Sequence, residues 1–363
     1  MKITAVILFI FLFTTNIFAA RTEGLKKNGC DFRTPTKSEK HNALYMSSYL
    51  LKKLHDLNKS YEKKGEVFQL AFVARTGTSP GANQLINNKK SYARLFKGLD
   101  LVFGPDDTQE DTVEDRLYSN VLRSNSKVND NRFSHIGIVY KNFDGRWSFI
   151  HMLYQCGKKA KGSNRVAKGA KGSSHIWTEG ITRFFVDKPY NYGAHIMVPV
   201  KSVRTQLYKL LINSNETFVK HIEEGVEVTL FKTNEGIYGK FLSPKYNAIS
   251  KPFSLRDQNS NQWPLELLAA SMAPEGSVRS RAEAHDYLKE TGYRPTRLWL
   301  KGKYTVAKII TGFIDTVDPF EQNYIEHNLV EVSTVLSVNQ YMKKNKVLDQ
   351  ELKIFLPRDL RKY

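Results

Sequence analysis

Two histidines lie close together in the sequence, on segments that have the composition of β-strands. We predict strands over Ile136 to Tyr140 and over Trp147 to Leu153, with His135 at the start of the first and His151 on the second. The intervening Asp144-Gly145 is a strong signal for a tight hairpin turn. Pairing outward from that turn brings the two imidazoles near one another, at the end of the hairpin away from the turn.

Neighbouring imidazoles can act as a general base with its orienting partner, or as two metal ligands. A metal would need a third ligand, and the sequence lacks the HxxxH or HxH spacing of zinc sites, so no metal or other cofactor is predicted. Gly137 shares a strand face with His135, and a glycine there lets a backbone or a ligand approach closely. That face is a candidate cleft wall, although two structural histidines would give the same pattern.

A second candidate region is a polar cluster that leads into an apolar helix. Tyr246 and the run Gln258 to Gln262 precede Trp263-Pro264 and the helical pattern of Leu265 to Met272. Deeper in a helix, the proline ring would clash with the carbonyl four residues earlier. This restriction makes Asn261 the predicted N-cap.

Ser260 would lie at the mouth of that helix. Free backbone N–H groups and the positive end of the helix dipole favour an anionic nucleophile or an oxyanion at such a position. The polar side chains nearby are candidate binding residues: Tyr246, Asn259, Asn261 and Gln262. The alternative is that Asn259, Ser260 and Asn261 only cap the helix.

The order of these motifs resembles the permuted papain-like fold typified by lecithin:retinol acyltransferase. The matching features are His135-x-Gly137, the second histidine His151 on the next strand, and Asn259 to Trp263 at a helix start. More closely, the segments AFVARTGT, RFSHIGIVYK, QNSNQWPLELLAA and TGYRPT are similar to an exported bacterial family described as domain of unknown function 2145. The similarity spans Cys30 to Val338 and implies an α+β fold, with an antiparallel sheet packed on helices.

The resemblance also implies a role for each candidate residue. His135 corresponds to the general base, His151 to the polar partner that orients it, and Ser260 to the nucleophile. Serine stands here where the papain-like superfamily places cysteine, and a serine hydroxyl depends more strongly on an adjacent base. Two hypotheses follow: an envelope amide or ester hydrolase or acyltransferase, and a catalytically inactive papain-like module that binds an envelope ligand.

The start of the chain predicts export. Met1-Lys2 precedes an apolar core from Ile3 to Phe13, and small residues follow at Ala19 and Ala20. This order is typical of a cleavable signal peptide, and the apolar core is shorter than the roughly 20 residues of a spanning helix. With no later apolar run of that length, we expect a periplasmic or secreted protein that has no transmembrane segment after cleavage.

The formal net charge of +19, from 55 Lys and Arg residues against 36 Asp and Glu residues, suits an anionic partner. Export argues against nucleic acid, and the sequence lacks aromatic-interleaved basic motifs that stack bases. We expect an anionic cell-envelope polymer, a peptide or a lipid as the partner. The Lys/Gly-rich loop at Lys158 to Gly172 is a candidate for docking it, and the sequence predicts no oligomeric state.

The chain has two cysteines, Cys30 and Cys156. An oxidising compartment permits them to pair in a disulfide that closes a long loop. The alternative assigns Cys156 as a nucleophile, because it follows His151 closely in the sequence.

Apolar periodicity and the motifs divide the chain into four parts. Residues 1–20 are the signal peptide, and residues 21–65 are an N-terminal segment with a helix over Ser38 to Lys64. The resemblance implies that residues 66–300 form the papain-like domain, and we expect a C-terminal strand-rich extension over residues 301–363. The other predicted elements are strands at Val67 to Val73, Ala194 to Pro199, Val226 to Phe231, Tyr304 to Ile314 and Leu329 to Val338, and helices at Val203 to Ile212 and Arg279 to Glu290.

Overall fold

The structure is a computed structural model, and it describes residues 37–76, 133–142, 145–155, 173–186, 192–212, 218–223, 226–231, 237–299, 329–357 and 360. Several predicted features lie outside these residues and stay predictions. They are the signal peptide, the disulfide between Cys30 and Cys156, the basic loop at 158–172 and the strand at Tyr304 to Ile314.

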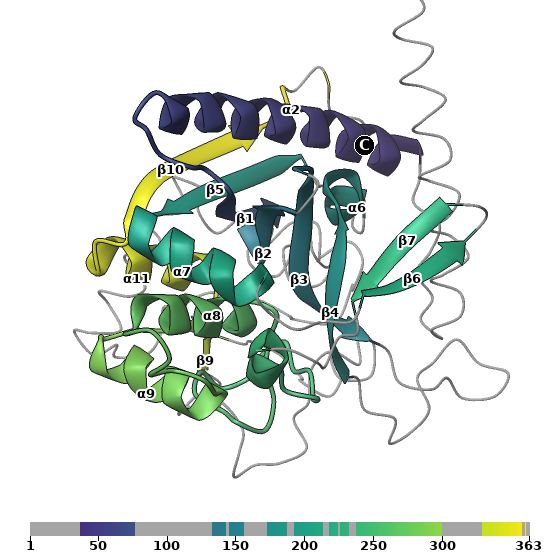
Figure 1. The fold of residues 1–363 in the computed structure, drawn as a ribbon. Helices are drawn as coiled ribbons and strands as arrows, with labels where there is room; N and C mark the ends of the chain where they lie inside the picture. Colours follow the sequence, from purple (N-terminus) through teal and green to yellow (C-terminus); the bar gives the residue numbers. More distant parts are fainter. Residues whose placement is uncertain are drawn as a thin grey trace, which may run out of the picture.

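A six-stranded antiparallel sheet organises the described part of the chain (Figure 1). Its strand order is β10-β5-β1-β2-β3-β4, and every neighbouring pair runs antiparallel. The strands are β1 Leu70–Thr76, β2 Phe133–Lys141, β3 Trp147–Gln155, β4 Ser173–Gly180, β5 Gly193–Pro199 and β10 Leu348–Phe355. The sheet and the helices around it confirm the predicted α+β class.

The predicted hairpin is confirmed as β2 and β3. The Asn142 side chain accepts a hydrogen bond from the Arg146 amide at 2.8 Å and closes the turn. Gly145 has a φ of +78°, in the left-handed region that glycine adopts without strain. At the other end, the paired register of β2 and β3 ends at Ile138 and Ile150.

The N-terminal helix is confirmed as α2 (Lys37–Glu62). Its apolar residues recur every three or four positions and are buried, among them Met46, Leu50, Leu54 and Leu57. Gly65, with a φ of +70°, follows the helix end. With the short helix α6 (Ile181–Val186), α2 covers one face of the sheet.

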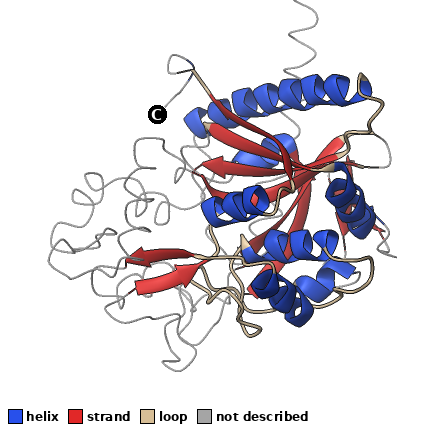
Figure 2. Cartoon of the chain, turned by 90° about the vertical axis from the view of Figure 1, so that its left-hand side faces the viewer, coloured by secondary structure: helices blue, strands red, loops and turns tan. Residues whose placement is uncertain are grey.

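The two faces of the sheet carry separate apolar clusters, because side chains alternate along each strand. Val73, Val139 and Ile196 pack under α2 and α6, while Phe72 and Ile138 belong to the cluster on the opposite face. Four helices pack in that second cluster: α7 Lys201–Ile212, α8 Gln262–Met272, α9 Arg281–Glu290 and α11 Val335–Lys344. Figure 2 shows the sheet between the long helix α2 and most of the shorter helices.

The C-terminal part differs from the prediction. The strand predicted over Leu329 to Val338 is wrong beyond Val332: β9 (Leu329–Val332) pairs with β8 (Thr296–Trp299), and α11 begins at Val335. Thr334 and Ser337 form a capping box there, so the local hydrogen bonding starts a helix. Strand β10, which sequence analysis missed, then pairs with β5, so this part of the chain joins the main sheet.

A second, two-stranded sheet pairs β6 (Phe218–Glu223) with β7 (Val226–Phe231), and a 3-10 helix, η2 (Ile237–Phe241), follows it. Residues 242–261 then lead into α8 and carry the predicted polar cluster. Among the described residues, no helix combines the length and the apolar character that crossing a bilayer requires.

Candidate functional site

The structure brings the two predicted histidines together in the sheet. Nε2 of His135 lies 2.8 Å from Nδ1 of His151, and both side chains are buried. Continuing the register from the pair Ile138 and Ile150 puts His151 opposite Gly137, and therefore diagonally across from His135 on the same face. The hairpin thus makes the contact that its sequence predicts.

A carboxylate that sequence analysis missed extends this contact. Oε1 of Glu179, on β4, lies 3.1 Å from Nε2 of His151, and the Glu179 side chain is only 7% exposed. The two atoms are at ion-pair distance but do not form a hydrogen bond with each other. Because His151 pairs with Trp177, Glu179 lies two residues further along the same strand face. We call His135, His151 and Glu179 the relay.

The geometry of the relay suits proton handling. The facing nitrogens of His135 and His151 share a hydrogen bond, so these two atoms do not converge on a metal ion. Within the described residues, no group of three or more His, Cys, Asp and Glu side chains is arranged to hold a metal. The carboxylate at the end of the relay lies at ion-pair distance from the second imidazole.

Aromatic rings pack against the relay on the α6 side of the sheet. Phe184 stacks on Phe149 with ring centroids 3.8 Å apart, and its own centroid lies 5.9 Å from that of His135 and 5.2 Å from that of His151. The guanidinium of Arg75, which lies opposite His135 on β1, is 4.6 Å from the centre of the Phe184 ring. These contacts restrict the rotation of both imidazoles.

Gly137 makes room for this packing. A Cβ atom there would lie 2.8 Å from Cε2 of Phe184 and 3.0 Å from Cδ1 of Phe149, closer than side chains tolerate. The close neighbour of this glycine is therefore an aromatic side chain, and not the backbone or ligand that the sequence suggested.

Asn261 occupies the N-cap position of α8, as predicted, but its side chain does not cap the helix. Its Oδ1 accepts a hydrogen bond from the Ile136 amide at 3.1 Å, and its Nδ2 donates to the Ser134 carbonyl at 3.2 Å. These backbone groups flank His135, in the part of β2 that lies beyond its paired register with β3. The mouth of α8 is therefore clamped to the strand at His135.

Asn259 caps the helix in place of Asn261. Its Oδ1 accepts hydrogen bonds from the amides of Asn261 and Gln262, both at 2.9 Å. In return, Oε1 of Gln262 accepts one from the Asn259 amide at 2.6 Å, a reciprocal arrangement like that of a capping box. The predicted binding residues Asn259, Asn261 and Gln262 thus hold the local backbone, and two of the N–H groups at the helix mouth are occupied.

Ser260 lies between the two asparagines and is 8% exposed. In the described part of the chain its side chain makes no hydrogen bond, so the structure does not join it to His135 or His151. The imidazoles lie on the α6 side of the sheet, whereas α8 packs on the other face. The segments that carry Ser260 and His135 are clamped together, while their side chains remain unbonded to each other.

Tyr246, the fourth predicted binding residue, packs partly buried against the cluster on the α8 face. Its backbone forms a single bridge with Gln258. The flanking Lys245 carbonyl and Asn247 amide both bond the backbone of Gln258, at 3.1 and 3.0 Å. This loop therefore supports the residues just before Ser260.

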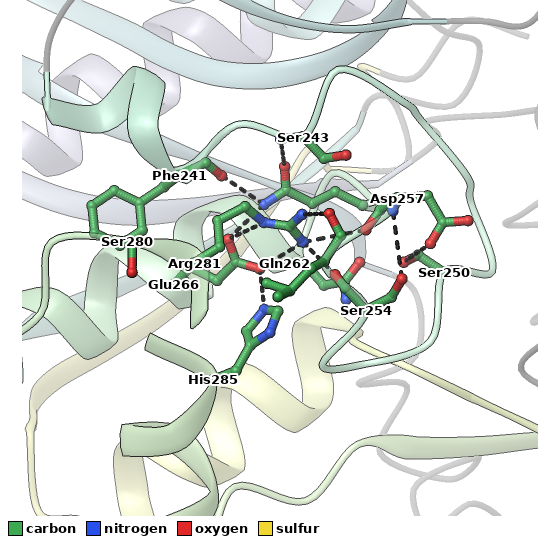
Figure 3. A network of polar contacts seen from close by, with 12 residues as sticks. Phe241, Ser243, Ser250, Ser254, Asp257, Gln262, Glu266, Ser280, Arg281 and His285 are labelled. Atoms are coloured by element: carbon green, nitrogen blue, oxygen red, sulfur yellow. Dashed lines mark hydrogen bonds and ion pairs between the residues drawn. The ribbon is translucent and has the colours of Figure 1, made fainter. Parts of the chain in front are cut away.

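A second buried polar network lies behind the helix mouth (Figure 3). The Glu266 carboxylate on α8 accepts hydrogen bonds from Arg281 on α9 through both oxygens, at 3.0 and 3.1 Å. Nε2 of His285 lies 2.8 Å from one of these oxygens, and the Gln258 side chain donates to the other at 2.7 Å. We call Gln258, Glu266, Arg281 and His285 the anchor.

The anchor fixes the loop that precedes Ser260. Arg281 donates to three backbone carbonyls of that loop, those of Ser254, Leu255 and Asp257. Gln258 donates to the Phe241 carbonyl at 2.9 Å and accepts from the Ser243 amide at 2.9 Å. The helix mouth is therefore held from behind by a charged network with many backbone contacts.

The C-terminal part supports the helix mouth from another side. The Ser333 carbonyl accepts hydrogen bonds from the side chains of Asn259 and Asn261, at 3.2 and 3.3 Å. The Ser333 hydroxyl accepts one from Tyr293 at 2.9 Å, and burial raises the pKa of Tyr293 to about 12, so this phenol stays a donor. Sequence analysis missed Ser333, because only the tertiary fold brings it to α8.

The described fold defines an α+β protein whose six-stranded antiparallel sheet carries a buried relay of two histidines and a glutamate. The family model described as "Uncharacterized protein conserved in bacteria (DUF2145)" matches residues 121–224 and 214–342, more than half of the chain. The chain belongs to this family, as the motif blocks predicted. RFSHIGIVYK, QNSNQWPLELLAA and TGYRPT lie within the matched residues, and AFVARTGT precedes them. No curated protein and no solved structure gives a significant match.

Proposed function

We propose that the chain is an exported amide or ester hydrolase, or an acyltransferase, with a papain-like arrangement of its site. The predicted signal peptide would direct it to the cell envelope. The relay would supply the general base, and Ser260 would be the nucleophile. The observation that carries the proposal is the buried contact of His135 with His151, extended by Glu179.

Burying the ionisable side chains of the relay lowers the stability of the fold, which argues against a purely structural role. Ionisable groups taken out of water lose hydration, and apolar side chains of similar size often stabilise such a position better. The relay lies beside the apolar and aromatic cluster on that face of the sheet, together with the buried Arg75. A base, its orienting partner and a terminal carboxylate are what acyl transfer needs in a water-poor site.

The proposed reaction begins when Ser260 Oγ attacks the acyl carbon of the substrate while His135 takes the hydroxyl proton. That proton then passes to the leaving amine or alcohol as the bond to the acyl carbon breaks, which leaves an ester on Ser260. Water or an acceptor alcohol or amine, deprotonated by His135, then attacks the ester carbon, and His135 returns the proton to Ser260 Oγ as its bond to the acyl group breaks. His151 and Glu179 would stabilise the imidazolium in each half-reaction.

The clamp made by Asn261 supports this pairing of Ser260 with His135. Asn261 follows Ser260 directly and bonds the backbone on both sides of His135, so the two segments keep a fixed register. The two side chains must still approach, because they are not hydrogen-bonded in the resting structure. Catalytic hydrogen bonds often tighten only when substrate binds.

A binding module without catalysis is the second candidate, and the helix mouth favours it. The amides of Asn261 and Gln262, which could have stabilised an oxyanion, already bond the Asn259 side chain. The relay also faces away from the sheet face on which α8 packs. In this version the site holds an envelope ligand and performs no reaction.

A fluorophosphonate probe on the purified mature protein separates the two candidates. A hydrolase should be labelled in the wild type, and labelling should be lost in both Ser260→Ala and His135→Ala. Ser48→Ala, at an exposed serine on α2, is the matched control and should keep full labelling. An unlabelled wild-type protein would favour the binding module.

A thiol at position 260 gives a second test that does not depend on substrate. In a Cys30→Ser, Cys156→Ser background, Ser260→Cys should be alkylated by iodoacetamide at pH 6, because a nearby imidazole stabilises the thiolate. Adding His135→Ala should move alkylation to a pH near that of a free thiol, about 8.5. If His135→Ala left the pH dependence of alkylation unchanged, the result would contradict the pairing of Ser260 with His135.

Cys156 remains a third candidate nucleophile, by its closeness to His151 in sequence. Mass spectrometry under non-reducing conditions tests it. A peptide in which Cys30 is linked to Cys156 would exclude this role and support the predicted disulfide.

Peptidoglycan peptides, lipoproteins and lipids are the candidate substrates or ligands. The net charge of +19 favours the anionic members of these classes. If the Lys/Gly-rich loop docks such a ligand, deleting residues 158–172 should weaken binding to anionic envelope polymers at low salt and have less effect at high salt.

A further inference from the structure

The terminal carboxylate of the relay determines which nitrogens of the two imidazoles carry hydrogen atoms. An ionised Glu179 can only accept hydrogen bonds, and its Oε1 lies 3.1 Å from Nε2 of His151. Without a hydrogen atom, Nε2 would bring a second centre of negative charge within 3.1 Å of that oxygen, which is repulsive, whereas an N–H group at this distance is attracted. Nε2 of His151 therefore carries a hydrogen atom.

The tautomer of His151 in turn determines the tautomer of His135. A neutral imidazole has one N–H group and one acceptor nitrogen. With its hydrogen on Nε2, His151 presents Nδ1 as an acceptor to Nε2 of His135, which lies 2.8 Å away. Nε2 of His135 must be the donor in this contact, so the lone pair of His135 lies on Nδ1.

We infer that Glu179 is a positioning residue that fixes the tautomers of both histidines, so that His135 presents Nδ1 as its proton acceptor. This deepens the proposed function, on which the use of that acceptor as a catalytic base rests. The tautomers themselves belong to the resting protein, and Glu179 reaches His135 only through His151.

The packing around Glu179 holds this arrangement. Glu179 pairs with Phe149 in the β3–β4 register, and Phe149 stacks on Phe184. The Phe184 ring in turn lies beside both imidazoles. The carboxylate and the two imidazoles are thus positioned by the same aromatic pair.

The relay can then take up one proton without losing a contact. A proton on Nδ1 of His135 leaves the bond from Nε2 of His135 to Nδ1 of His151 intact. A second proton, on Nδ1 of His151, would place N–H groups on two nitrogens only 2.8 Å apart and break that bond. One transferable proton is what a base that returns its proton to a leaving group requires.

Nitrogen-15 NMR of the full chain, labelled at its nine histidines and measured at pH 7.5, tests the assignment. Signals that disappear in His135→Gln and His151→Gln identify the two residues. Both should be Nε2–H tautomers in the wild type. In Glu179→Gln, the side-chain amide can donate as well as accept, so His151 should become a mixture of tautomers, and His135 with it.

Glu351→Gln is the matched control. It removes the carboxylate that lies 2.7 Å from Nε2 of another buried histidine, His195, and should leave the relay signals unchanged. An Nδ1–H tautomer of His151 in the wild type, or unchanged tautomers in Glu179→Gln, would overturn the inference. If Glu179→Gln fails to fold, the tautomers of the wild-type protein alone still test the inference.

Fluorophosphonate labelling distinguishes failure of this inference from failure of the proposed function. If both hold, Glu179→Gln should slow labelling on the order of 100-fold or more, as loss of the proper tautomer does in hydrolase triads. A wild-type protein that shows the Nε2–H tautomers but no labelling would contradict only the proposed function. Normal labelling together with Nδ1–H at His151 would contradict only the role of Glu179.

Discussion

The relay and the anchor each contain a buried histidine beside a glutamate, but the surroundings of the two pairs differ. Nε2 of His151 lies 3.1 Å from Oε1 of Glu179, and Nε2 of His285 lies 2.8 Å from Oε1 of Glu266. In the anchor, Arg281 neutralises the carboxylate through two hydrogen bonds. In the relay, the histidine beside the carboxylate also bonds a second imidazole.

This difference separates a scaffold from a candidate reaction site. The anchor holds three backbone carbonyls through one arginine, so its charges are tied to the path of the chain. The relay bonds side chain to side chain, and moving a proton along it requires no change in the backbone. The two regions should therefore respond differently when a charge is removed.

The largest expected effect is in the anchor. Arg281→Ala leaves the buried Glu266 carboxylate without its counter-ion, which should lower the free energy of unfolding by about 3–5 kcal/mol. Urea denaturation measures this change. Arg279→Ala, at an exposed arginine just before α9, is the control and should change stability by less than about 0.5 kcal/mol. A small effect at Arg281 would show that the anchor is not the scaffold.

Gly137→Ala should have the next largest effect, and it acts on the relay. The new methyl group would collide with Phe184 and Phe149, so we expect a loss of about 1–3 kcal/mol and altered histidine NMR signals. Gly180→Ala is the matched control, because a Cβ there meets nothing within 4 Å. Equal stability of the two variants would contradict the packing of Phe184 against β2.

Asn259→Ala should cost about 1–2 kcal/mol, in line with the loss of a helix cap. Its Oδ1 accepts from two amides at the mouth of α8. The substitution would free the Asn261 amide, while the Gln262 amide keeps its bond to the carbonyl of residue 259 at 3.1 Å. In the binding module this change only weakens the fold, whereas in a hydrolase the freed amide should speed fluorophosphonate labelling of Ser260. Thermal denaturation and the labelling rate together measure the two effects.

Local patterns predicted most of the helices, strands and the hairpin. The spacing of apolar residues gave α2, α7 and α9, and Asp144-Gly145 gave the turn that joins the two histidine strands. The contact of His135 with His151 followed from that turn, because antiparallel pairing leaves little freedom in register. These features depend on residues that are near each other in sequence.

The parts that were missed depend on contacts across the fold. Glu179 meets His151 only because β4 pairs with β3 in one register, and Ser333 meets Asn259 only because the turn between β9 and α11 lies at the mouth of α8. Asn261 occupies the predicted N-cap position, but its side chain bonds the backbone of β2 around His135 and not the amides of the helix. Tertiary hydrogen bonds outweighed the local preference there.

The smallest effect concerns a third histidine and carboxylate pair, at the sheet edge. The hydrogen bond from His195, with a further one from Lys343, holds the pKa of Glu351 well below its ordinary value of 4.5. Because the folded-state pKa is lowered, the stabilisation is fully present above about pH 4.5 and is lost as pH falls through the folded-state pKa. The Glu351 side chain is 22% exposed, so solvent screens part of this stabilisation.

Glu351→Gln should therefore lower the free energy of unfolding by about 1 kcal/mol at pH 7, and the difference from the wild type should narrow progressively below pH 4.5. Urea denaturation at pH 7, 5 and 3.5 measures it, with Glu275→Gln as an exposed control. A difference that stays constant over this range would mean that His195 does not hold the Glu351 charge. Such a result would leave the relay and the anchor as the two places where a histidine and a carboxylate act as a unit.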